Sequence, residues 1–460
     1  MARTSIAGLS VFTTWDSVAE FSRVRDDILS KPLPSLATPF TKDETFDRYC
    51  VYHATVPMPV YQQGEPPYST TGGGWAFDAS GKPVKQRDEV ARIVVTIPRS
   101  PMPSKGFPVV LFSRTGAGGD RPLVDRGVQP SHNAPPLVPG SGPAQNFAAA
   151  GYAGVSVDGP HGGLRNVTNA DEQFTMFNVA NLDALRDNVR QSAIELVLQA
   201  HLLDTLEVPL TGENACEGAS TSDGGAARFD TTHLGLMGHS MGATIAPLSF
   251  AAEEKFGALI LSGAGGSYIE NVMHKRSPVT VLPVAELLVG YAGDTHLHEH
   301  DPILSLLQWA TEPADPPVYT PSVLHGPKAK ARHVLMLQGI VDTYILPPIA
   351  NCTSLSFGLD QAGKPLDQTT PGVAQYTPLE PLLTYSGRSR IDLPASGNVD
   401  VNGVPATALV IQHPQDEVED GHEVVFQTEA PKHEYRCFLQ SWLSGAPKVP
   451  NGQGEFDPCP

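Results

Sequence analysis

Cysteine and long apolar runs are both scarce in this chain, and each scarcity excludes a class of protein. The 460 residues include only five cysteines, and no two of them have the Cys-x-x-Cys spacing of zinc and dithiol sites. One or two disulfides are compatible with their positions, with at least one thiol left over. No stretch approaches the roughly 20 apolar residues of a membrane-spanning helix, so no transmembrane segment is expected. The cysteines are Cys50, Cys216, Cys352, Cys437 and Cys459.

Basic residues are also scarce. Lysine and arginine total 31 against 49 acidic residues, which gives a formal charge of −18 and argues against electrostatic binding of nucleic acid or anionic membranes. The apolar content of 40% and the charged content of 17% are typical of a globular protein. The first residues lack the apolar core of a signal peptide, so we expect either a cytoplasmic protein or the mature form of an exported one.

Glycine and proline are abundant, at 43 residues each, which predicts many turns and loops between short elements. Residues 182–203 have the apolar spacing of an amphipathic helix. Strands that alternate with helices predict a mostly parallel sheet covered by helices. Seven apolar runs predict the strands, at 91–98, 107–112, 153–158, 233–238, 257–262, 333–338 and 407–412.

The spacing of these runs suggests a core with additions. Residues 1–90 show little helical periodicity and are expected to form a β-rich N-terminal extension packed on the core. The core itself is expected at 91–265 and 331–445, with a loop-rich excursion at 351–405 and a tail at 446–460.

Residues 266–330 interrupt the core and are rich in apolar side chains. They predict a helical cap that lines an acyl pocket, although the same side chains would also suit simple packing on the core. Within this segment His296, His298 and His300 alternate. We expect a solvated turn there rather than a metal site, because nothing nearby completes a ligand set.

The most informative motif is the Gly-x-Ser-x-Gly sequence at 238–242, which lies between a predicted strand and a helix that begins near Met241. A serine at such a turn projects its hydroxyl outward, and the flanking glycines remove side chains that would clash. The helix behind it directs N–H groups at a developing oxyanion. Ser240 is therefore the predicted nucleophile.

A serine nucleophile needs a base and a carboxylate that orients the base. Asp342 follows the predicted strand at 333–338, and His422 lies in the loop after the strand at 407–412, which gives the order serine, acid, histidine. His413 is the rival base, but it stands at the end of its strand. Asp158 is the rival acid, but it precedes the serine.

The predicted oxyanion hole consists of two backbone donors. One is the N–H of Met241, and the other comes from the loop after the strand at 107–112, from Thr115 or Gly116. Arg114 in that loop would add positive charge near the oxyanion or bind an acidic group of the substrate. His239 and Trp309 are further candidates for substrate contacts.

From about residue 90 to 445 the chain resembles the α/β-hydrolase superfamily. More narrowly it is similar to bacterial extracellular or virulence-factor-type lipases and esterases, on the segments RDNVRQS at 186–192 and DPILSLLQW at 301–309. The resemblance implies the α/β-hydrolase fold, hydrolysis of carboxylic esters without metal or organic cofactor, and export from the cell. Such enzymes usually have His-Gly where this chain has Arg114 and Thr115.

Together these features predict a serine carboxylesterase or lipase that acts on a small or lipid-like ester. An amidase, urethanase or polyester hydrolase would use the same residues. A non-catalytic binding protein, a lyase and a dehalogenase are also compatible with this fold, since fold alone does not decide function.

Overall fold

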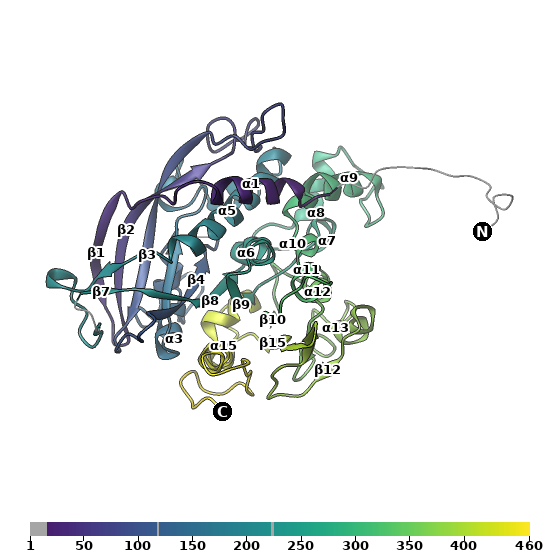
Figure 1. Ribbon diagram of the computed structural model, residues 1–460. Helices are drawn as coiled ribbons and strands as arrows, with labels where there is room; N and C mark the ends of the chain where they lie inside the picture. The colour runs from purple at the N-terminus through teal and green to yellow at the C-terminus, as the bar shows by residue number, and fades with distance from the viewer. Residues whose placement is uncertain (1–15, 117–118, 222–224) are drawn as a thin grey trace.

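The computed structural model describes residues 16–116, 119–221 and 225–460, and these residues are arranged around one large sheet (Figure 1). Eleven strands form this sheet, in the order β1-β2-β3-β5-β4-β8-β9-β10-β15-β11-β12. The pairs β1–β2, β2–β3 and β3–β5 are antiparallel, and every pair from β5 to β12 is parallel. The carboxyl ends of the parallel strands therefore meet at one edge, where open α/β sheets place their functional loops.

All seven predicted strands are present, and each matches a strand of this sheet. The predicted helix at 182–203 is α5 (Leu182–Leu202). The strands are β1 (Thr38–Thr45), β2 (Tyr49–Val60), β3 (Arg87–Pro98), β4 (Phe107–Ser113), β5 (Ala153–Val157), β8 (Phe229–His239), β9 (Phe256–Ser262), β10 (His333–Ile340), β15 (Ala408–Pro414), β11 (Asp360–Ala362) and β12 (Arg390–Ile391).

Helices cover both faces of the sheet. One face packs against α1 (Ala19–Leu29), α5, α6 (Met241–Ala252) and α12 (Pro347–Phe357), and the other against α3 (Pro143–Ala149) and α15 (Glu429–Trp442) (Figure 1). Successive strand residues alternate between the two cores, because side chains of a strand point to opposite faces. In β10, for example, Val334 and Met336 join the first core while Leu335 and Leu337 join the second.

The connections identify the fold class. The chain passes from β4 outward to β5 and then back across β4 to β8, and a sharp turn after β8 leads into α6 in the centre of the sheet. Strand order, parallel direction and this central turn are those of the α/β-hydrolase fold. The predicted fold class is confirmed.

The N-terminal section differs from its prediction. Its long strand β2 pairs with β3 over its whole length, but a helix, α1, precedes the strands. The expectation of little helical periodicity was wrong for this segment: Phe21, Val24 and Ile28 lie three and four residues apart and face the core.

Strand β1 forms one edge of the sheet, and its pairing with β2 is irregular at two points. The backbone N–H of Lys42 donates to Asn214 Oδ1 at 2.9 Å, and the Lys42 ammonium donates to the carbonyl of Ala215 at 2.7 Å. The opposite edge is β12, which has only two residues.

The segment 266–330 is helical but divided. Helices α7 (Tyr268–His274), α8 (Val281–Leu288) and α9 (Pro302–Thr311) form a small apolar cluster of their own around Val272, Leu297 and Leu304. Helices α10 (Pro316–Tyr319) and α11 (Pro321–Leu324) instead contribute to the main core through Tyr319 and Val323. Only the outer part is therefore separate from the core.

The segment 351–405 contains short elements rather than loops alone, and two of them, β11 and β12, extend the sheet beyond β15. Besides short 3-10 turns, the remaining α-helices of the described chain are α2 (Pro122–Asp125), α4 (Glu172–Met176), α13 (Leu379–Leu382) and α14 (Val424–Gln427). The remaining strands form two pairs, β6 (Val208–Pro209) with β7 (Ala226–Ala227) and β13 (Val399–Val401) with β14 (Val404–Ala406).

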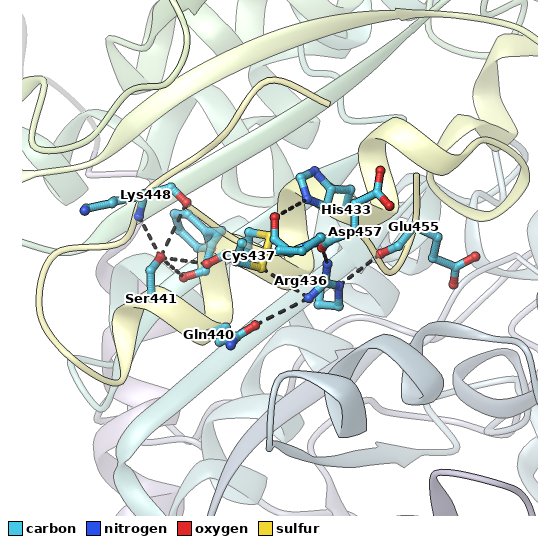
Figure 2. Close-up of a disulfide and its surroundings, with 11 residues drawn as sticks. His433, Arg436, Cys437, Gln440, Ser441, Lys448, Glu455 and Asp457 are labelled. Carbon is cyan, nitrogen blue, oxygen red and sulfur yellow. Dashed lines mark hydrogen bonds between the residues drawn. A yellow bond between two sulfur atoms is a disulfide. The ribbon is translucent and has the colours of Figure 1, made fainter. Parts of the chain in front are cut away.

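Two disulfides use four of the five cysteines. Cys50–Cys216 joins β2 to a segment 166 residues later, and Cys437–Cys459 joins α15 to the C-terminal tail. Arg436 also holds the tail, because it donates to the carbonyl oxygens of Glu455 and Asp457 (Figure 2). The fifth cysteine, Cys352, keeps its thiol. Among the helices of the described residues, none is both long and apolar enough to span a membrane.

Candidate active site

Ser240 occupies the sharp turn between β8 and α6. Its φ of 55° and ψ of −119° are strained for a residue with a side chain, as expected for a serine held at a strand-to-helix turn. The Ser240 N–H donates to the carbonyl of Ser262, at the end of the neighbouring strand β9, at 3.0 Å. The turn is therefore fixed to the carboxyl edge of the sheet.

The two glycines of the motif are required by close packing. A side-chain carbon at Gly238 would lie 2.4 Å from the carbonyl oxygen of Gly242, and one at Gly242 would lie 2.5 Å from the carbonyl oxygen of Arg114. A side chain at Gly238 would therefore distort the turn itself, and one at Gly242 would push the turn away from the loop after β4. Gly242 thus allows the close approach of the turn to the predicted oxyanion loop.

Asp342 and His422 are in direct contact. His422 Nδ1 and Asp342 Oδ2 are 2.8 Å apart, and both side chains are buried. The other carboxylate oxygen of Asp342 accepts the N–H groups of Tyr344 and Ile345 at 2.8 and 2.7 Å. Both oxygens are occupied, so the carboxylate has one orientation and fixes that of the imidazole.

The loops that carry these two residues are bound to each other. The Gly421 N–H donates to the carbonyl of Val341 at 2.7 Å. Asp420 accepts the N–H of His422 at 2.9 Å and that of Thr343 at 3.1 Å. The position of His422 relative to Asp342 therefore depends on backbone contacts as well as on the side-chain pair.

Ser240 and His422 lie on either side of residues 262–263. The Ser240 N–H binds the carbonyl of Ser262, and a side-chain carbon at Gly263 would lie 2.6 Å from His422 Cε1. His422 Nε2 is buried and has no hydrogen-bond partner among the described residues. A buried ring nitrogen without a partner is available to accept a proton.

Tyr344 and Lys275 form one wall of this site. The ring of Tyr344 stacks on that of His422, with centroids 4.5 Å apart and an interplanar angle of 19°. Lys275 donates to the carbonyl of Tyr344 at 3.0 Å. Burial lowers the pKa of Lys275 to about 8, and the charge of Asp342 partly opposes this shift.

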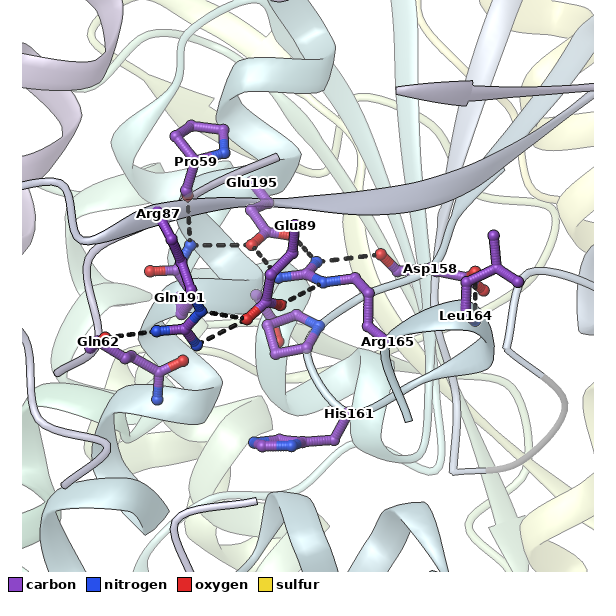
Figure 3. Close-up of polar contacts among 12 residues, drawn as sticks. Pro59, Gln62, Arg87, Glu89, Asp158, His161, Leu164, Arg165, Gln191 and Glu195 are labelled. Atoms are coloured by element: carbon purple, nitrogen blue, oxygen red, sulfur yellow. Dashed lines mark hydrogen bonds and ion pairs between the residues drawn. The ribbon is translucent and has the colours of Figure 1, made fainter. Parts of the chain in front are cut away.

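The two rival residues have other partners. His413 points to α15, where its Nε2 lies 2.8 Å from Glu434 Oε2. Asp158 lies at the end of β5, and its Oδ2 accepts the N–H group of Arg92. The same oxygen accepts the N–H group of Leu164 (Figure 3). Its backbone carbonyl accepts from Arg165, which is paired with Glu195. Of the predicted acids and bases, the structure brings Asp342 and His422 together.

The predicted oxyanion donors have different surroundings. Met241 is the first residue of α6, so its N–H has no acceptor within the helix. The Gly116 N–H donates to Thr115 Oγ1 at 2.7 Å and is therefore already used. Arg114 is buried, with its guanidinium bonded to Glu172 and to the carbonyl of Pro160, so its charge is already paired.

Three charged or titratable side chains lie behind His422. His239 has no exposed surface, and its ring centroid lies 4.8 Å from that of His422. Burial lowers the pKa of His239 to about 3, and the charge of Arg126 adds to this effect, so the ring is neutral. Glu423 Oε1 lies 3.8 Å from His239 Nε2 and is ion-paired with Arg126.

The remaining predicted substrate contact, Trp309, and the three alternating histidines lie in the segment 266–330. Trp309 is on α9 and is 60% exposed. His296 Nδ1 lies 3.2 Å from Glu286 Oε1, and His296 stands with His298 and His300 in an irregular segment rather than a strand.

In the described part of the chain, two groups of side chains have metal-ligand atoms within 4.8 Å of one another. One contains Cys437 and Cys459, which are joined as a disulfide. The other contains His239, His422 and Glu423, but the Glu423 carboxylate is held by Arg126, whose positive charge disfavours a cation there. Neither group offers a free set of ligands.

No protein-family model and no curated protein matches this chain. Solved structures are similar at low identity. An acetyl xylan esterase from Paenibacillus sp. R4 is 11% identical over 74% of this chain and 84% of that one, with a TM-score of 0.44. Acetyl xylan esterase 1 from Thermoanaerobacterium sp. JW/SL YS485 is 12% identical over 87% and 89%, with a TM-score of 0.42. A glucuronoyl esterase from Solibacter usitatus is 13% identical over 91% of each chain, with a TM-score of 0.41.

Sequence reasoning missed Arg126, Tyr344 and Lys275. Tyr344 had a usable signal, since it follows the predicted acid by two residues. Arg126 and Lys275 had none, because they reach the site from segments far away in the sequence and outside any motif.

Proposed function

We propose that this protein is a serine hydrolase that cleaves carboxylic esters, with Ser240 as nucleophile, His422 as general base and Asp342 as the residue that orients the base. One observation carries the proposal: His422 is held by a carboxylate at 2.8 Å and keeps a buried Nε2 without a hydrogen-bond partner, and residues 262–263 adjoin both this ring and the strained turn of Ser240. Nucleophilic catalysis by serine needs a base that can reach the hydroxyl and a carboxylate that orients the base.

In the acylation step, the Ser240 hydroxyl proton passes to His422 Nε2 while Oγ bonds to the ester carbonyl carbon. The N–H of Met241 and a donor from Thr115 would stabilise the oxyanion that forms. His422 then gives its proton to the alcohol oxygen, the carbon–oxygen bond of the ester breaks, and the alcohol leaves. Asp342 stabilises the charged imidazolium between these two transfers.

In the deacylation step, a water molecule loses a proton to His422 Nε2 and attacks the acyl carbon. The bond to Ser240 Oγ breaks, Oγ takes the proton back from His422, and the carboxylic acid is released. Every proton taken is returned, so the step needs no further reactant.

The cap supports a small or lipid-like ester as substrate. Helices α8 and α9 carry apolar side chains that are largely exposed, including Leu287, Leu288 and Leu306. An exposed apolar surface suits an acyl chain better than a charged polymer.

The first test is hydrolysis of p-nitrophenyl esters from acetate to palmitate, with the Ser240→Ala protein as blank. We expect turnover by the native protein and a loss on the order of a millionfold in kcat in the variant, as for comparable serine enzymes. A fluorophosphonate probe should label Ser240 and no other serine, as read by peptide mass spectrometry.

A variant loss below roughly tenfold would contradict the role of Ser240. Ser240-dependent turnover of an amide or urethane, with none on any ester, would instead make the protein an amidase or urethanase. Labelling of Ser240 without turnover of any substrate would favour a binding protein.

A further inference from the structure

Arg126 joins two loops that the proposed reaction uses separately. It follows α2, and its Nη1 donates to Thr115 Oγ1 at 2.8 Å in the loop after β4. Its Nε and Nη2 donate to the two carboxylate oxygens of Glu423 at 3.1 and 2.5 Å. Glu423 is the residue after His422, and 297 positions separate it from Arg126. The planar guanidinium suits this task, because it offers several donors in fixed directions.

The position of the guanidinium is itself restrained. Its carbon lies 4.8 Å from the ring centroid of Phe426, which belongs to α14 in the segment after Glu423. Stacking on an aromatic face and a two-pronged bond to a carboxylate both limit rotation. The position of Thr115 therefore depends, through Arg126, on the position of the loop that carries His422.

The hydrogen bond from Arg126 to Thr115 limits the further hydrogen bonds that the Thr115 hydroxyl can form. Thr115 Oγ1 accepts from Arg126 Nη1 and also from the Gly116 N–H at 2.7 Å. A hydroxyl oxygen has two acceptor sites and one proton, so its remaining capacity is that of a donor. Bonding to a cation also makes that proton a stronger donor.

The ion pair between Arg126 and Glu423 sets the net charge next to the proposed general base, His422. Burial acts to raise the pKa of Glu423, but the charge of Arg126 and the contact with His239 outweigh it, and the pKa is held below its ordinary value. Glu423 is thus ionised at neutral pH, and its charge interacts with His422. Arg126 neutralises most of this charge.

We propose, on the basis of the function proposed above, that Arg126 is a positioning residue that aligns the oxyanion loop with the base. Through Thr115 it orients a donor toward the oxyanion, and through Glu423 it keeps the environment of His422 close to neutral. Arg126 touches no reacting atom in this scheme. Its loss affects catalysis rather than the binding of substrate.

The pH profile separates this role from a merely structural ion pair. In Arg126→Met the unpaired Glu423 carboxylate favours the imidazolium of His422, so the acid limb of kcat/KM moves to higher pH. In Glu423→Gln the unpaired Arg126 disfavours the imidazolium, so the limb moves to lower pH. The groups that face His422 and share in this balance are Asp342 and Tyr344 after β10, His239 at the end of β8, Asp420 and Glu423 in its own loop, Arg126 after α2, and Lys275 through its effect on Asp342.

The test uses the full chain and compares Arg126→Met, Glu423→Gln and Arg121→Met on the best ester found above. We expect Arg126→Met to lose about 10- to 100-fold in kcat with KM within about threefold, which is at or below the effect of removing one oxyanion donor. The acid limbs of Arg126→Met and Glu423→Gln should move in opposite directions, each by about half a pH unit or more.

Arg121→Met is the matched control. Arg121 also pairs with two carboxylates, those of Asp125 and Glu44, but contacts neither Thr115 nor the His422 loop. Its loss should leave kcat and the pH profile unchanged. An equal fall in kcat in this control, or limbs that do not move in folded Arg126→Met and Glu423→Gln proteins, would overturn the proposal.

Arg126→Lys and Thr115→Val keep the proposal open to refutation if Arg126→Met does not fold. The lysine should still pair with Glu423 but lose the bond to Thr115, so kcat falls while the acid limb stays in place. Thr115→Val should lower kcat by a similar factor, and full activity in folded Thr115→Val contradicts the role of its hydroxyl. If the native protein shows no Ser240-dependent turnover, the proposed function fails instead, which the Ser240→Ala blank reveals separately.

Discussion

At the scale of single residues, Asp342 has two roles, one for each carboxylate oxygen. Oδ1 accepts two backbone N–H groups of its own loop, and Oδ2 binds His422. An amide at this position can keep the first set of bonds through its oxygen. Its NH2 group must then face His422 Nδ1, which forces that nitrogen to accept and leaves the proton on Nε2.

Asp342→Asn should therefore preserve the fold and remove the activity. We expect a loss of about 10⁴-fold in kcat, the effect of a wrong imidazole tautomer in a comparable serine enzyme. Steady-state kinetics and the thermal midpoint check this together. A loss of activity accompanied by unfolding would show that the variant tests the loop rather than the tautomer.

Gly263 is a second residue with a specific task. A side-chain carbon there would lie 2.6 Å from the His422 ring, and its φ is +55°. Gly263→Ala should displace the ring and lower kcat by at least about tenfold, because small shifts of catalytic groups are costly. Gly290→Ala is the control, since Gly290 has a φ of +76° but open space around it. Equal kinetics in the two variants would contradict a role for the close contact between residue 263 and the His422 ring.

The sequence predicted these residues unequally. The motif around Ser240 and the chain order of Asp342 and His422 led to the prediction of all three as catalytic residues, and the structure brings Asp342 and His422 into contact. The contact of Arg126 with Thr115 and Glu423 could not be predicted, since it depends on how three loops approach one another in space. The hydrogen bond from the Gly116 N–H to Thr115 Oγ1 could not be predicted either, because it depends on the local conformation of this loop.

At the scale of secondary-structure elements, His333 links β10 to the segment before β15. Its Nδ1 accepts the N–H of Thr407 at 3.1 Å, which requires the neutral ring, and burial lowers its pKa to about 4. The folded value lies below the ordinary value of about 6.5. The unfolded chain thus binds a proton first as the pH falls, and stability is lost between about pH 6.5 and 4.

His333→Asn should remove this dependence, because an amide oxygen can accept the same N–H and does not titrate. The free energy of unfolding of the variant, relative to the native protein, should rise by about 3 kcal/mol between pH 7.5 and 4. Denaturant unfolding at several pH values measures it. The exposed His300, replaced in the same way, should give no such change.

The elements themselves were well predicted where apolar runs are continuous, as in β4, β8 and β10. Helix α1 was missed because only three apolar residues of this helix are buried, Phe21, Val24 and Ile28, among many polar ones. The strands β11 and β12 were missed because two or three residues carry no periodic signal, and only the exposed edge of β15 makes strands of them.

At the scale of the whole molecule, the two disulfides restrain the chain unequally. Cys50–Cys216 closes a loop of 166 residues and Cys437–Cys459 one of 22. A longer loop restricts the unfolded chain more, so the first disulfide stabilises the fold by about 5 kcal/mol and the second by about 3 kcal/mol in the chain-entropy description. Such bonds persist in oxidising compartments and are rare in a reducing cytosol.

Replacing Cys50 and Cys216 by serine should therefore lower stability more than replacing Cys437 and Cys459. Denaturant midpoints of the two double variants, with the native protein and Cys352→Ser for comparison, provide the measurement. Burial raises the pKa of Cys352 to about 12, so its thiol is unreactive and Cys352→Ser should resemble the native protein. A larger loss of stability in the Cys437/Cys459 double variant would show that these disulfides act mainly through contacts of the folded state rather than by restricting the unfolded chain.

The irregular edge of the sheet has a consequence for how copies of this protein meet. A second molecule that approached β1 would find its pairing pattern interrupted twice and the amide of Lys42 already bonded to Asn214. At the other margin, β12 offers only two residues. A sheet whose two edges are such poor templates is not expected to extend into the sheet of a second molecule, so edge-to-edge pairing into fibres is disfavoured.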